Sequence, residues 1–310
     1  MKKSFILQVT VFLLCFPFTL LVAQEVTFGM VTDTHYAEIP DNGSRTYSQS
    51  LGKLQECVDT MNHCKVDFLI ELGDFKDMSQ PADEQQTLSF LQKAENMFGL
   101  FKGRRFHVLG NHDEDCISKQ QFLSIAHNSR SGNKKTWYSF NSGGFHFIVL
   151  DANFDSTGKD FDHGRFDWGD PNIPPEELNW LREDLHTTMN PVIVFTHQLL
   201  DGQGPYVVKN AKEVRKMLES SGKVKCVFQG HYHEGRYSKT NDIHYYTLRC
   251  LVDGKSPEGN SFAIVTATKD MISIKGYKRA VSLNLPINVT IATDDYRNEG
   301  DYDWEPREEQ

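Results

Sequence analysis

The sequence has few cysteines, and their positions exclude a disulfide scaffold. It has 6 cysteines in 310 residues, and Cys15 lies inside an N-terminal apolar run, which leaves an odd number in the rest of the chain. Cys57 and Cys64 stand in a stretch with helical periodicity, which separates their Cα atoms by about 10.5 Å, too far for a bridge. Cys226 falls in an apolar run and is predicted to be a core residue. No cysteine lies where a catalytic nucleophile is expected.

Positive charge is also scarce. The chain has 33 Lys and Arg residues against 42 Asp and Glu residues, a formal net charge of -9, and it has no basic stripe. This balance argues against general nucleic-acid binding. An anionic substrate would therefore need a local positive charge, such as a bound metal. Much of the negative charge lies in residues 281–310, which are predicted to be an acidic C-terminal tail.

A long uncharged apolar run occurs at the N-terminus. Lys2 and Lys3 precede the apolar residues 5–21, and Ala23 offers a small residue at a cleavage position. Residues 1–23 are therefore predicted to be a signal peptide, and the mature protein to be periplasmic or secreted without a stable membrane anchor. An uncleaved anchor helix is the alternative, and the shortness of the run and Pro17 argue against it.

The rest of the chain alternates between strand-like and helix-like stretches. The predicted strands are residues 26–31, 66–70, 106–109, 137–140, 145–150, 191–195 and 224–228, with further hairpin-like runs from 236 to 277. The predicted helices are residues 46–64, 83–98, 118–126, 175–185 and 210–219. This alternation predicts an α/β architecture with parallel pairing through crossover helices. We expect one domain over residues 24–280, with two facing sheets that send their loops to one end.

Metal-ligating side chains follow five of the strand-like runs. The candidate ligands are Asp33, His35, Asp74, Asn111, His197, His231 and His233. Any one of them alone has an ordinary alternative, since a strand-end Asp often caps a helix and a single His is usually structural. Their joint recurrence at strand ends favours a site for two metals, with Asp74 shared between them. Oxygen and imidazole ligands suit Mn, Fe or Zn better than metals that prefer thiolates.

These motifs resemble the calcineurin-like metallophosphoesterase superfamily. The family pattern is D-x-H, G-D, G-N-H-[DE], a strand-end His and G-H-x-H, and here it occurs as Asp33-Thr34-His35, Gly73-Asp74, Gly110-Asn111-His112-Asp113, His197 and Gly230-His231-Tyr232-His233. The resemblance spans roughly residues 27 to 233 and implies a β-sandwich flanked by helices. The purple-acid variant of the family is a poorer match, because Asp77 stands where that variant has a tyrosine ligand.

The resemblance also implies a division of the ligands between two divalent metals. One metal would take Asp33, His35, Asp74 and His233, and the other would take Asp74, Asn111, His197 and His231. Two metals about 3.5–4 Å apart can hold a hydroxide nucleophile and clamp the phosphoryl oxygens. His112 is expected to act as the acid that protonates the leaving oxygen, and Asp113 is expected to orient His112.

A shorter resemblance points to the substrate. Tyr36-Ala37, Arg45, Tyr47 and Ser50-Leu51 are similar to the manganese-dependent ADP-ribose/CDP-alcohol diphosphatase branch, although that branch often has Gln where His35 stands and is usually intracellular. We therefore predict hydrolysis of a phosphodiester or pyrophosphate bond in a small phosphorylated substrate, with a nucleotide-type substrate as one option. A broad phosphomonoesterase with the same site is the alternative. A non-catalytic metal-binding scaffold and a nuclease are less favoured.

The stretch from Phe154 to Pro175 has little periodicity, and loops this long are uncommon unless they are functional. We expect it to border the site, with Phe161, His163, Arg165 and Trp168 as candidate contacts to a base or phosphate. Arg45 and Tyr206 are candidates of the same kind. The alternative is a packed surface loop with aromatic anchors.

Overall fold

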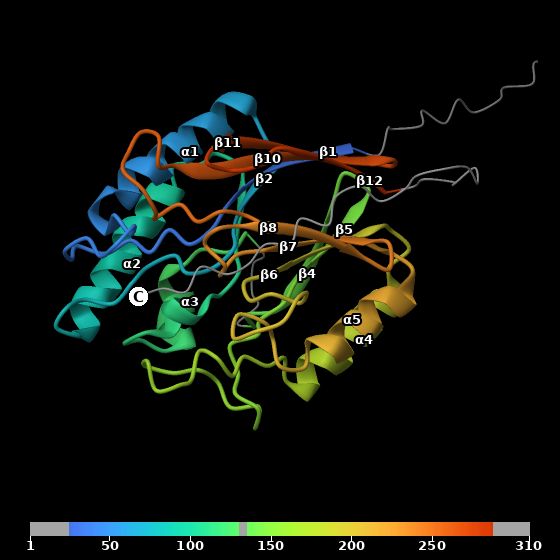
Figure 1. Cartoon of the computed structure of the whole chain (residues 1–310), viewed down its shortest axis with the longest axis horizontal. Helices are drawn as coiled ribbons and strands as arrows, with labels where there is room; N and C mark the ends of the chain where they lie inside the picture. The colour runs from blue at the N-terminus through green and yellow to red at the C-terminus, as the bar shows by residue number, and fades with distance from the viewer. Residues whose placement is uncertain (1–24, 130–134, 288–310) are drawn as a thin grey trace, which may run out of the picture.

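The computed structural model describes residues 25–129 and 135–287 (Figure 1). The predicted signal peptide, residues 1–23, and most of the predicted acidic tail lie outside these ranges, so their predictions stay untested. In the described ranges, no helix combines the length and the apolarity needed to cross a membrane. The cysteines of the described ranges are all free, and Cys226 is buried in the core, as predicted.

The chain folds into two six-stranded sheets, which confirms the predicted two-sheet α/β architecture. The first sheet has the order β12-β11-β10-β1-β2-β3 and the second has the order β4-β5-β6-β7-β9-β8. The strands of the first sheet are β1 (Glu25–Val31), β2 (Phe68–Glu71), β3 (Arg104–His107), β10 (Ser261–Thr268), β11 (Met271–Lys278) and β12 (Leu283–Pro286). The strands of the second sheet are β4 (Tyr138–Ser142), β5 (Phe145–Val149), β6 (Val192–Thr196), β7 (Val224–Gln229), β8 (Arg236–Thr240) and β9 (Ile243–Thr247).

Parallel pairing occurs at the centre of both sheets. β1, β2 and β3 pair in parallel in the first sheet, and β5, β6, β7 and β9 do so in the second. The carboxyl ends of parallel strands meet at one edge, where α/β sheets bind ligands. The first sheet also continues beyond the domain boundary predicted at residue 280, because β12 pairs with β11. Residues 283–286 of the predicted tail therefore belong to the sheet.

Five α-helices cover the outer faces of the sandwich in the described residues (Figure 1). Those packed against the first sheet are α1 (Ser50–Cys64), α2 (Glu84–Phe98) and α3 (Lys119–Ile125). Those packed against the second sheet are α4 (Pro175–Thr187) and α5 (Ala211–Ser221). Two short 3-10 turns, Tyr47–Gln49 and Asn111–Glu114, lie in the loops at the strand ends.

The sheets meet through an aromatic core. Phe28 of β1 stacks on Phe68 of β2 with 4.8 Å between ring centroids, and its edge meets the rings of Phe147, Phe195 and Phe228 in the second sheet. Alternate residues of β1 and β2 face the helices instead, as Leu69 does. Strands buried on both faces require the near-continuous apolar runs seen in the sequence. This core holds the two sets of strand-end loops against each other.

Candidate metal centre

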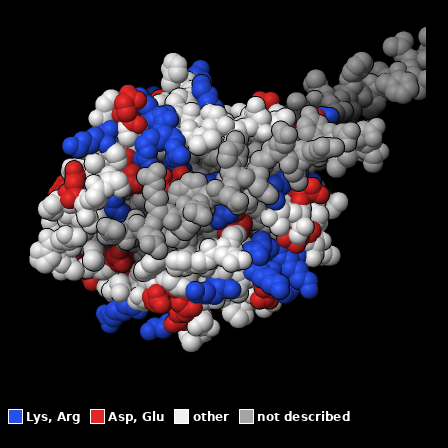
Figure 2. Space-filling model, in the orientation of Figure 1, with Lys and Arg blue, Asp and Glu red and all other residues white. Residues whose placement is uncertain are grey.

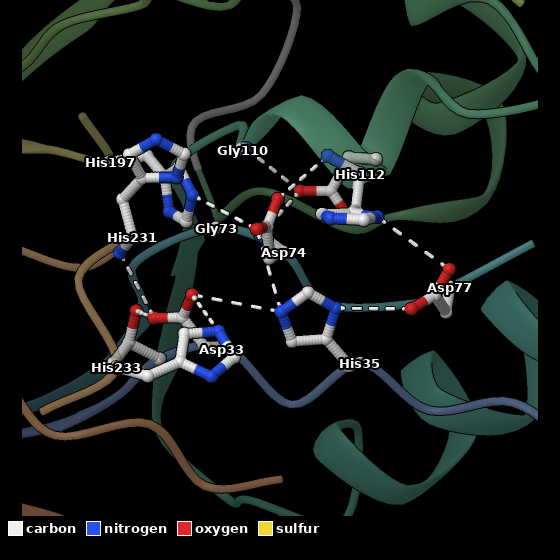
Figure 3. Close-up of polar contacts among 12 residues, drawn as sticks. Asp33, His35, Gly73, Asp74, Asp77, Gly110, His112, His197, His231 and His233 are labelled. Atoms are coloured by element: carbon white, nitrogen blue, oxygen red, sulfur yellow. Dashed lines mark hydrogen bonds and ion pairs between the residues drawn. The ribbon is translucent and has the colours of Figure 1, made fainter. Parts of the chain in front are cut away.

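The loops after the central strands of both sheets converge on one point (Figure 3). The candidate ligands from the first sheet are Asp33 and His35 after β1, Asp74 after β2 and Asn111 after β3. Those from the second sheet are His197 after β6, and His231 and His233 after β7. All of these side chains except His233 are buried.

Four of the ligand residues have a left-handed backbone. The φ angles are 50° at Asp33, 44° at His35, 57° at Asp74 and 67° at His231. Such conformations cost on the order of 1–3 kcal/mol each in residues other than glycine, and they persist only where the surroundings impose them. Here the Asp33 N–H donates to the Gly73 carbonyl at 3.0 Å, and the His35 N–H donates to the Asp74 carbonyl at 2.8 Å. The two loops therefore hold each other's ligands in place.

Two glycines permit the close approach of these loops. A Cβ added at Gly110 would lie 2.3 Å from the Asp74 backbone nitrogen. A Cβ added at Gly230 would lie 2.2 Å from Thr32 Oγ1 and 2.9 Å from Asp33 Oδ2. Neither contact is possible for a real side chain. The glycines of the G-N-H and G-H-x-H motifs are thus required by packing between the loops.

The ligand atoms form two groups that share Asp74. In the first group, Asp33 Oδ1 lies 3.7 Å from His35 Nε2 and 3.4 Å from His233 Nε2. In the second group, Asp74 Oδ2 lies 3.1 Å from His197 Nε2, and His231 completes a cluster with both. Asp74 Oδ2 is also 3.5 Å from His35 Nε2. The geometry thus places one carboxylate between two sets of donors.

The donor atoms fit bound cations. Several of them are buried and have no hydrogen-bond partner among the described residues: Asp33 Oδ1, His35 Nε2, Asn111 Oδ1, His197 Nε2 and His231 Nε2. A buried polar atom without a partner costs about 1–3 kcal/mol. A divalent cation in each group would satisfy these atoms, and the mixture of carboxylate, amide and imidazole is one that Mn²⁺, Fe²⁺ and Zn²⁺ accept. Burial lowers the pKa of His231 to about 3, so its imidazole is in the neutral form that binds metal.

The second nitrogen of three of the four candidate imidazole ligands is held from outside the centre. His197 Nδ1 lies 2.8 Å from the Leu72 carbonyl, which directs Nε2 inward. His35 Nδ1 is 3.4 Å from Asp77 Oδ2, and His233 Nδ1 is 3.5 Å from Asp253 Oδ2. Such outer contacts set the tautomer and the basicity of a ligand.

His112 lies at the open side of the centre, with a side chain 26% exposed. Its backbone N–H donates to Asp74 Oδ1 at 2.7 Å, and its Nδ1 lies 2.7 Å from Asp115 Oδ2 and 3.6 Å from Asp77 Oδ1. Burial lowers the pKa of His112, but Asp74, Asp115 and Asp77 outweigh this and raise it well above its usual value. These carboxylates hold the His112 ring beside both ligand groups, where the predicted acid would have to lie.

The predicted role of Asp113 needs correction. Asp113 accepts N–H groups from Asp74 at 3.0 Å, Phe75 at 2.9 Å and Gly110 at 2.9 Å. It therefore fastens the Gly110 loop to the Asp74 turn, while Asp115 makes the contact with His112. The reason is the 3-10 turn over Asn111–Glu114, which directs the carboxylate of Asp113 back to its own N-cap at Gly110.

Comparison with known proteins agrees with this geometry. Residues 26–235 match the family described as calcineurin-like phosphoesterase. The chain belongs to this family. It is therefore a metal-dependent phosphoester hydrolase, and its cofactors are two divalent metal ions, as predicted.

Named relatives of this phosphoesterase extend over most of its length. The manganese-dependent ADP-ribose/CDP-alcohol diphosphatase of Oryza sativa is 26% identical over 81% of this chain and 90% of its own. The human serine/threonine-protein phosphatase CPPED1 is 24% identical over 82% of each chain. The crystal structure of a dimetal phosphatase from Danio rerio has the same fold, with a TM-score of 0.74, 21% identity and coverage of 85% of this chain and 99% of that chain.

Four of the predicted substrate contacts of the phosphoesterase fall into two pairs. Arg45 and Tyr206 lie at the centre: Arg45 Nη1 is 3.8 Å from Asp77 Oδ2, and the Tyr206 ring is 5.3 Å from that of His231. His163 instead contacts Asp162 and Glu84, at 2.7 and 3.4 Å.

Arg165 closes a backbone turn with Asp162, and among the described residues it makes no contact with a candidate metal ligand. The loop around these two residues is tied to the segment that follows His112, since the His163 N–H donates to the Ile117 carbonyl and the Gly164 N–H to the Glu114 carbonyl. Neither His163 nor Arg165 is brought to the ligand groups.

Trp168, from the same long loop as His163, does lie beside the ligand groups, with its ring centroid 5.9 Å from that of His231 and 5.7 Å from that of Tyr206. The structure also adds two carboxylates that the sequence did not assign. Asp77 and Asp115 hold His35 and His112. Asp77 could have been found from its place three residues after Asp74, whereas nothing in the pattern distinguishes Asp115 from its neighbour Asp113.

Proposed function

We propose that this phosphoesterase hydrolyses a phosphodiester or pyrophosphate bond in a small substrate that carries a planar ring, such as a nucleotide-type diphosphate ester. The observation that carries this proposal is a group of aromatic rings beside the centre. Trp168 and Tyr206 are 44% and 37% exposed, and Tyr232 lies 5.3 Å from Tyr206 between ring centroids. Large rings exposed together next to metal ligands offer a stacking surface that a bare phosphate group would not use.

The energetics favour a ring-bearing substrate. Stacking of a base on an aromatic side chain contributes about 1–3 kcal/mol. That is enough to raise affinity about tenfold or more, since 1.4 kcal/mol corresponds to a factor of ten. The relatives named as ADP-ribose/CDP-alcohol diphosphatases, among them that of Oryza sativa, support the same substrate class and manganese as the metal.

The residues of the chain divide the work of the reaction. Bound divalent ions supply Lewis acidity and lower the pKa of water. Asp33, His35, Asp74 and His233 would hold one ion, and Asp74, Asn111, His197 and His231 would hold the other. His112 donates a proton to the leaving oxygen from the open side of the centre. Asp115 and Asp77 hold its ring for that transfer.

A phosphomonoesterase is the second candidate, because CPPED1 is named as a serine/threonine-protein phosphatase. The two functions separate in one assay of the protein with Mn²⁺. We expect faster hydrolysis of bis-p-nitrophenyl phosphate than of p-nitrophenyl phosphate, and cleavage of ADP-ribose. A preference for the monoester, with ADP-ribose left intact, would replace the diesterase proposal with the phosphatase.

A matched pair of variants tests the aromatic surface. Trp168→Ala should raise KM for ADP-ribose about tenfold through lost stacking. Tyr237→Ala serves as the control, because Tyr237 is 44% exposed on β8 and stacks on His244, away from the centre. Equal KM values for the two variants would remove the support that the rings give to a nucleotide-type substrate.

Two further parts of the proposal concern partners and location. On the described surface of the face in Figure 2, basic and acidic side chains are interspersed in small groups, which favours a small substrate over a nucleic acid.

The predicted export of the chain through residues 1–23 remains part of the proposal. Expression of the full chain followed by N-terminal sequencing should give Gln24 as the first residue, whereas an intact Met1 would contradict cleavage.

A further inference from the structure

The metal centre has different side chains on its two flanks. Figure 3 shows His197 and His231 at one end of the ligand groups and Asp77 at the other. The rings of Trp168 and Tyr206 contact His231, with centroids 5.9 and 5.3 Å away. These rings define the aromatic flank, which comprises Trp168, Tyr206 and Tyr232.

The opposite flank is charged. Asp77 lies within 3.4 to 3.8 Å of three cationic or protonatable groups, namely His35 Nδ1, His112 Nδ1 and Arg45 Nη1. The Arg45 side chain is 31% exposed, so its guanidinium has donors left over for a ligand. Asp115 is the other carboxylate here, bound to His112. This charged flank comprises Arg45, Asp77, His112 and Asp115.

We propose that a diphosphate ester binds in a single orientation, with its ring-bearing half on the aromatic flank and its second phosphate on the charged flank beside Arg45 and His112. This orientation rests on the proposed function and determines which phosphorus is attacked. The phosphorus between the ligand groups is the one attached to the ring-bearing half. The leaving group is the second phosphate.

The bond changes follow from this placement. The oxygen of water bonds to the phosphorus of the ring-bearing half, and the bond from that phosphorus to the bridging oxygen breaks. The bridging oxygen leaves with the second phosphate and takes a proton from His112, which regains one from solvent. The ring-bearing product therefore carries the oxygen of water, and the other product keeps the bridging oxygen.

The reverse orientation is disfavoured by charge. It would set an uncharged ring against the carboxylates of Asp77 and Asp115 and take water from them without a compensating contact. It would also leave the second phosphate on aromatic rings that cannot neutralise it. In the proposed orientation, the Arg45 guanidinium meets a phosphate, for which its planar set of donors is suited.

Hydrolysis of ADP-ribose in ¹⁸O-labelled water tests the orientation. With the Mn²⁺-loaded protein, mass spectrometry of the products should find ¹⁸O in AMP and none in ribose 5-phosphate. Label in ribose 5-phosphate, or in both products, would overturn the orientation while leaving the proposed function intact. If ADP-ribose is not cleaved although bis-p-nitrophenyl phosphate is, the nucleotide-type function fails and the orientation falls with it.

Arg45→Ala separates a phosphate contact from a structural role. Loss of a charged hydrogen bond worth about 1.5–3 kcal/mol should lower kcat/KM for ADP-ribose about 10- to 100-fold. The loss on bis-p-nitrophenyl phosphate should be at least about tenfold smaller, because that diester has no second phosphate. Equal losses on both substrates would show that Arg45 only supports Asp77 and would remove the second-phosphate site from the charged flank.

Discussion

The two sheets supply different chemistry to the metal centre. The candidate ligands of the first sheet are mostly oxygen donors: Asp33, His35, Asp74 and Asn111. Those of the second sheet are all imidazoles: His197, His231 and His233. The backbone differs too, because three of the first-sheet ligands have positive φ angles and only His231 does in the second sheet. The first sheet thus holds carboxylates on strained backbone, whereas the second presents imidazoles from more relaxed loops.

This difference shows where the centre depends on the packing of the sandwich. Among the residues that the structure describes, Asp74 is the one carboxylate within 3.5 Å of imidazoles from both sheets, at His35 and His197. The aromatic core between the sheets determines their separation and therefore whether Asp74 can serve both groups. We therefore expect that neither sheet can compensate for a ligand lost from the other. The four predictions below are in order of decreasing effect.

Asp74→Asn should have the largest effect, because it weakens the shared ligand. We expect both metal equivalents to be lost and kcat/KM to fall by at least about 1,000-fold, since several kcal/mol of transition-state stabilisation depends on the metals. Metal content by mass spectrometry and the rate on bis-p-nitrophenyl phosphate measure this. Asp59→Asn, at an exposed position of α1, is the control. Retention of both metals in Asp74→Asn would contradict a shared carboxylate.

His231→Ala should affect one group only, because His231 clusters with Asp74 and His197 and not with Asp33. About one metal equivalent should remain, held by the first group, and activity should fall about 100-fold or more. Metal titration by calorimetry resolves the two equivalents. Loss of both equivalents would show that the two groups are not separable.

Asp253→Asn should weaken the centre without removing a ligand. Its carboxylate lies 3.5 Å from His233 Nδ1, and outer contacts of this kind change metal affinity about 10- to 100-fold. We expect weaker binding of one equivalent, with kcat restored at saturating Mn²⁺. Binding of the equivalent that includes His197 should not change, because the outer contact of His197 is the Leu72 carbonyl, which the substitution leaves in place. An unchanged metal affinity in Asp253→Asn would show that Asp253 does not support His233 as a metal ligand.

The smallest effect concerns the pH dependence of the first sheet. His107 of β3 lies 3.5 Å from Glu71 and 3.0 Å from Glu95, and although burial lowers its pKa, these carboxylates raise it to about 9. The protonated ring therefore stabilises the fold fully below about pH 6.5, and this stabilisation is lost as pH rises through about 9. Burial raises the pKa of Glu71 to about 8, which acts in the same direction.

The comparison with His107→Gln isolates this contribution. Between pH 6.5 and 9.5, the thermal midpoint of the chelator-treated protein should fall about 5 °C more than that of the variant. Parallel curves for the two proteins would mean that the proton on His107 does not contribute to stability. A steeper curve for His107→Gln would contradict the sign.

Sequence patterns were sufficient for the ligand set to be proposed and for the fold to be predicted, for one physical reason. Parallel strands end at a common edge, so residues such as Asp33 and Asp74 that directly follow apolar runs must lie near one another. Gly230 and Gly110 marked the tight contacts between these loops. The different roles of Asp113 and Asp115 were not predictable, since they depend on the 3-10 turn that contains Asp113 and has Asp115 as its C-cap.

The residues around the centre depended on tertiary contacts that leave little trace in sequence. His163 and Trp168 belong to the same aperiodic loop, yet His163 pairs with Glu84 of α2 while Trp168 packs beside His231. The backbone hydrogen bonds that anchor this loop determine that Trp168, and not His163, lies beside the centre. β12 was likewise assigned to the tail, because its short sequence has no pattern until it pairs with β11.

The central claim is that the two sheets together hold two metals through Asp74. Anomalous scattering from crystals grown with Mn²⁺ tests it most directly. We expect two peaks, one among Asp33, His35 and His233 and one among Asn111, His197 and His231, with Asp74 in contact with both. A single peak, or a second peak that does not touch Asp74, would contradict the claim.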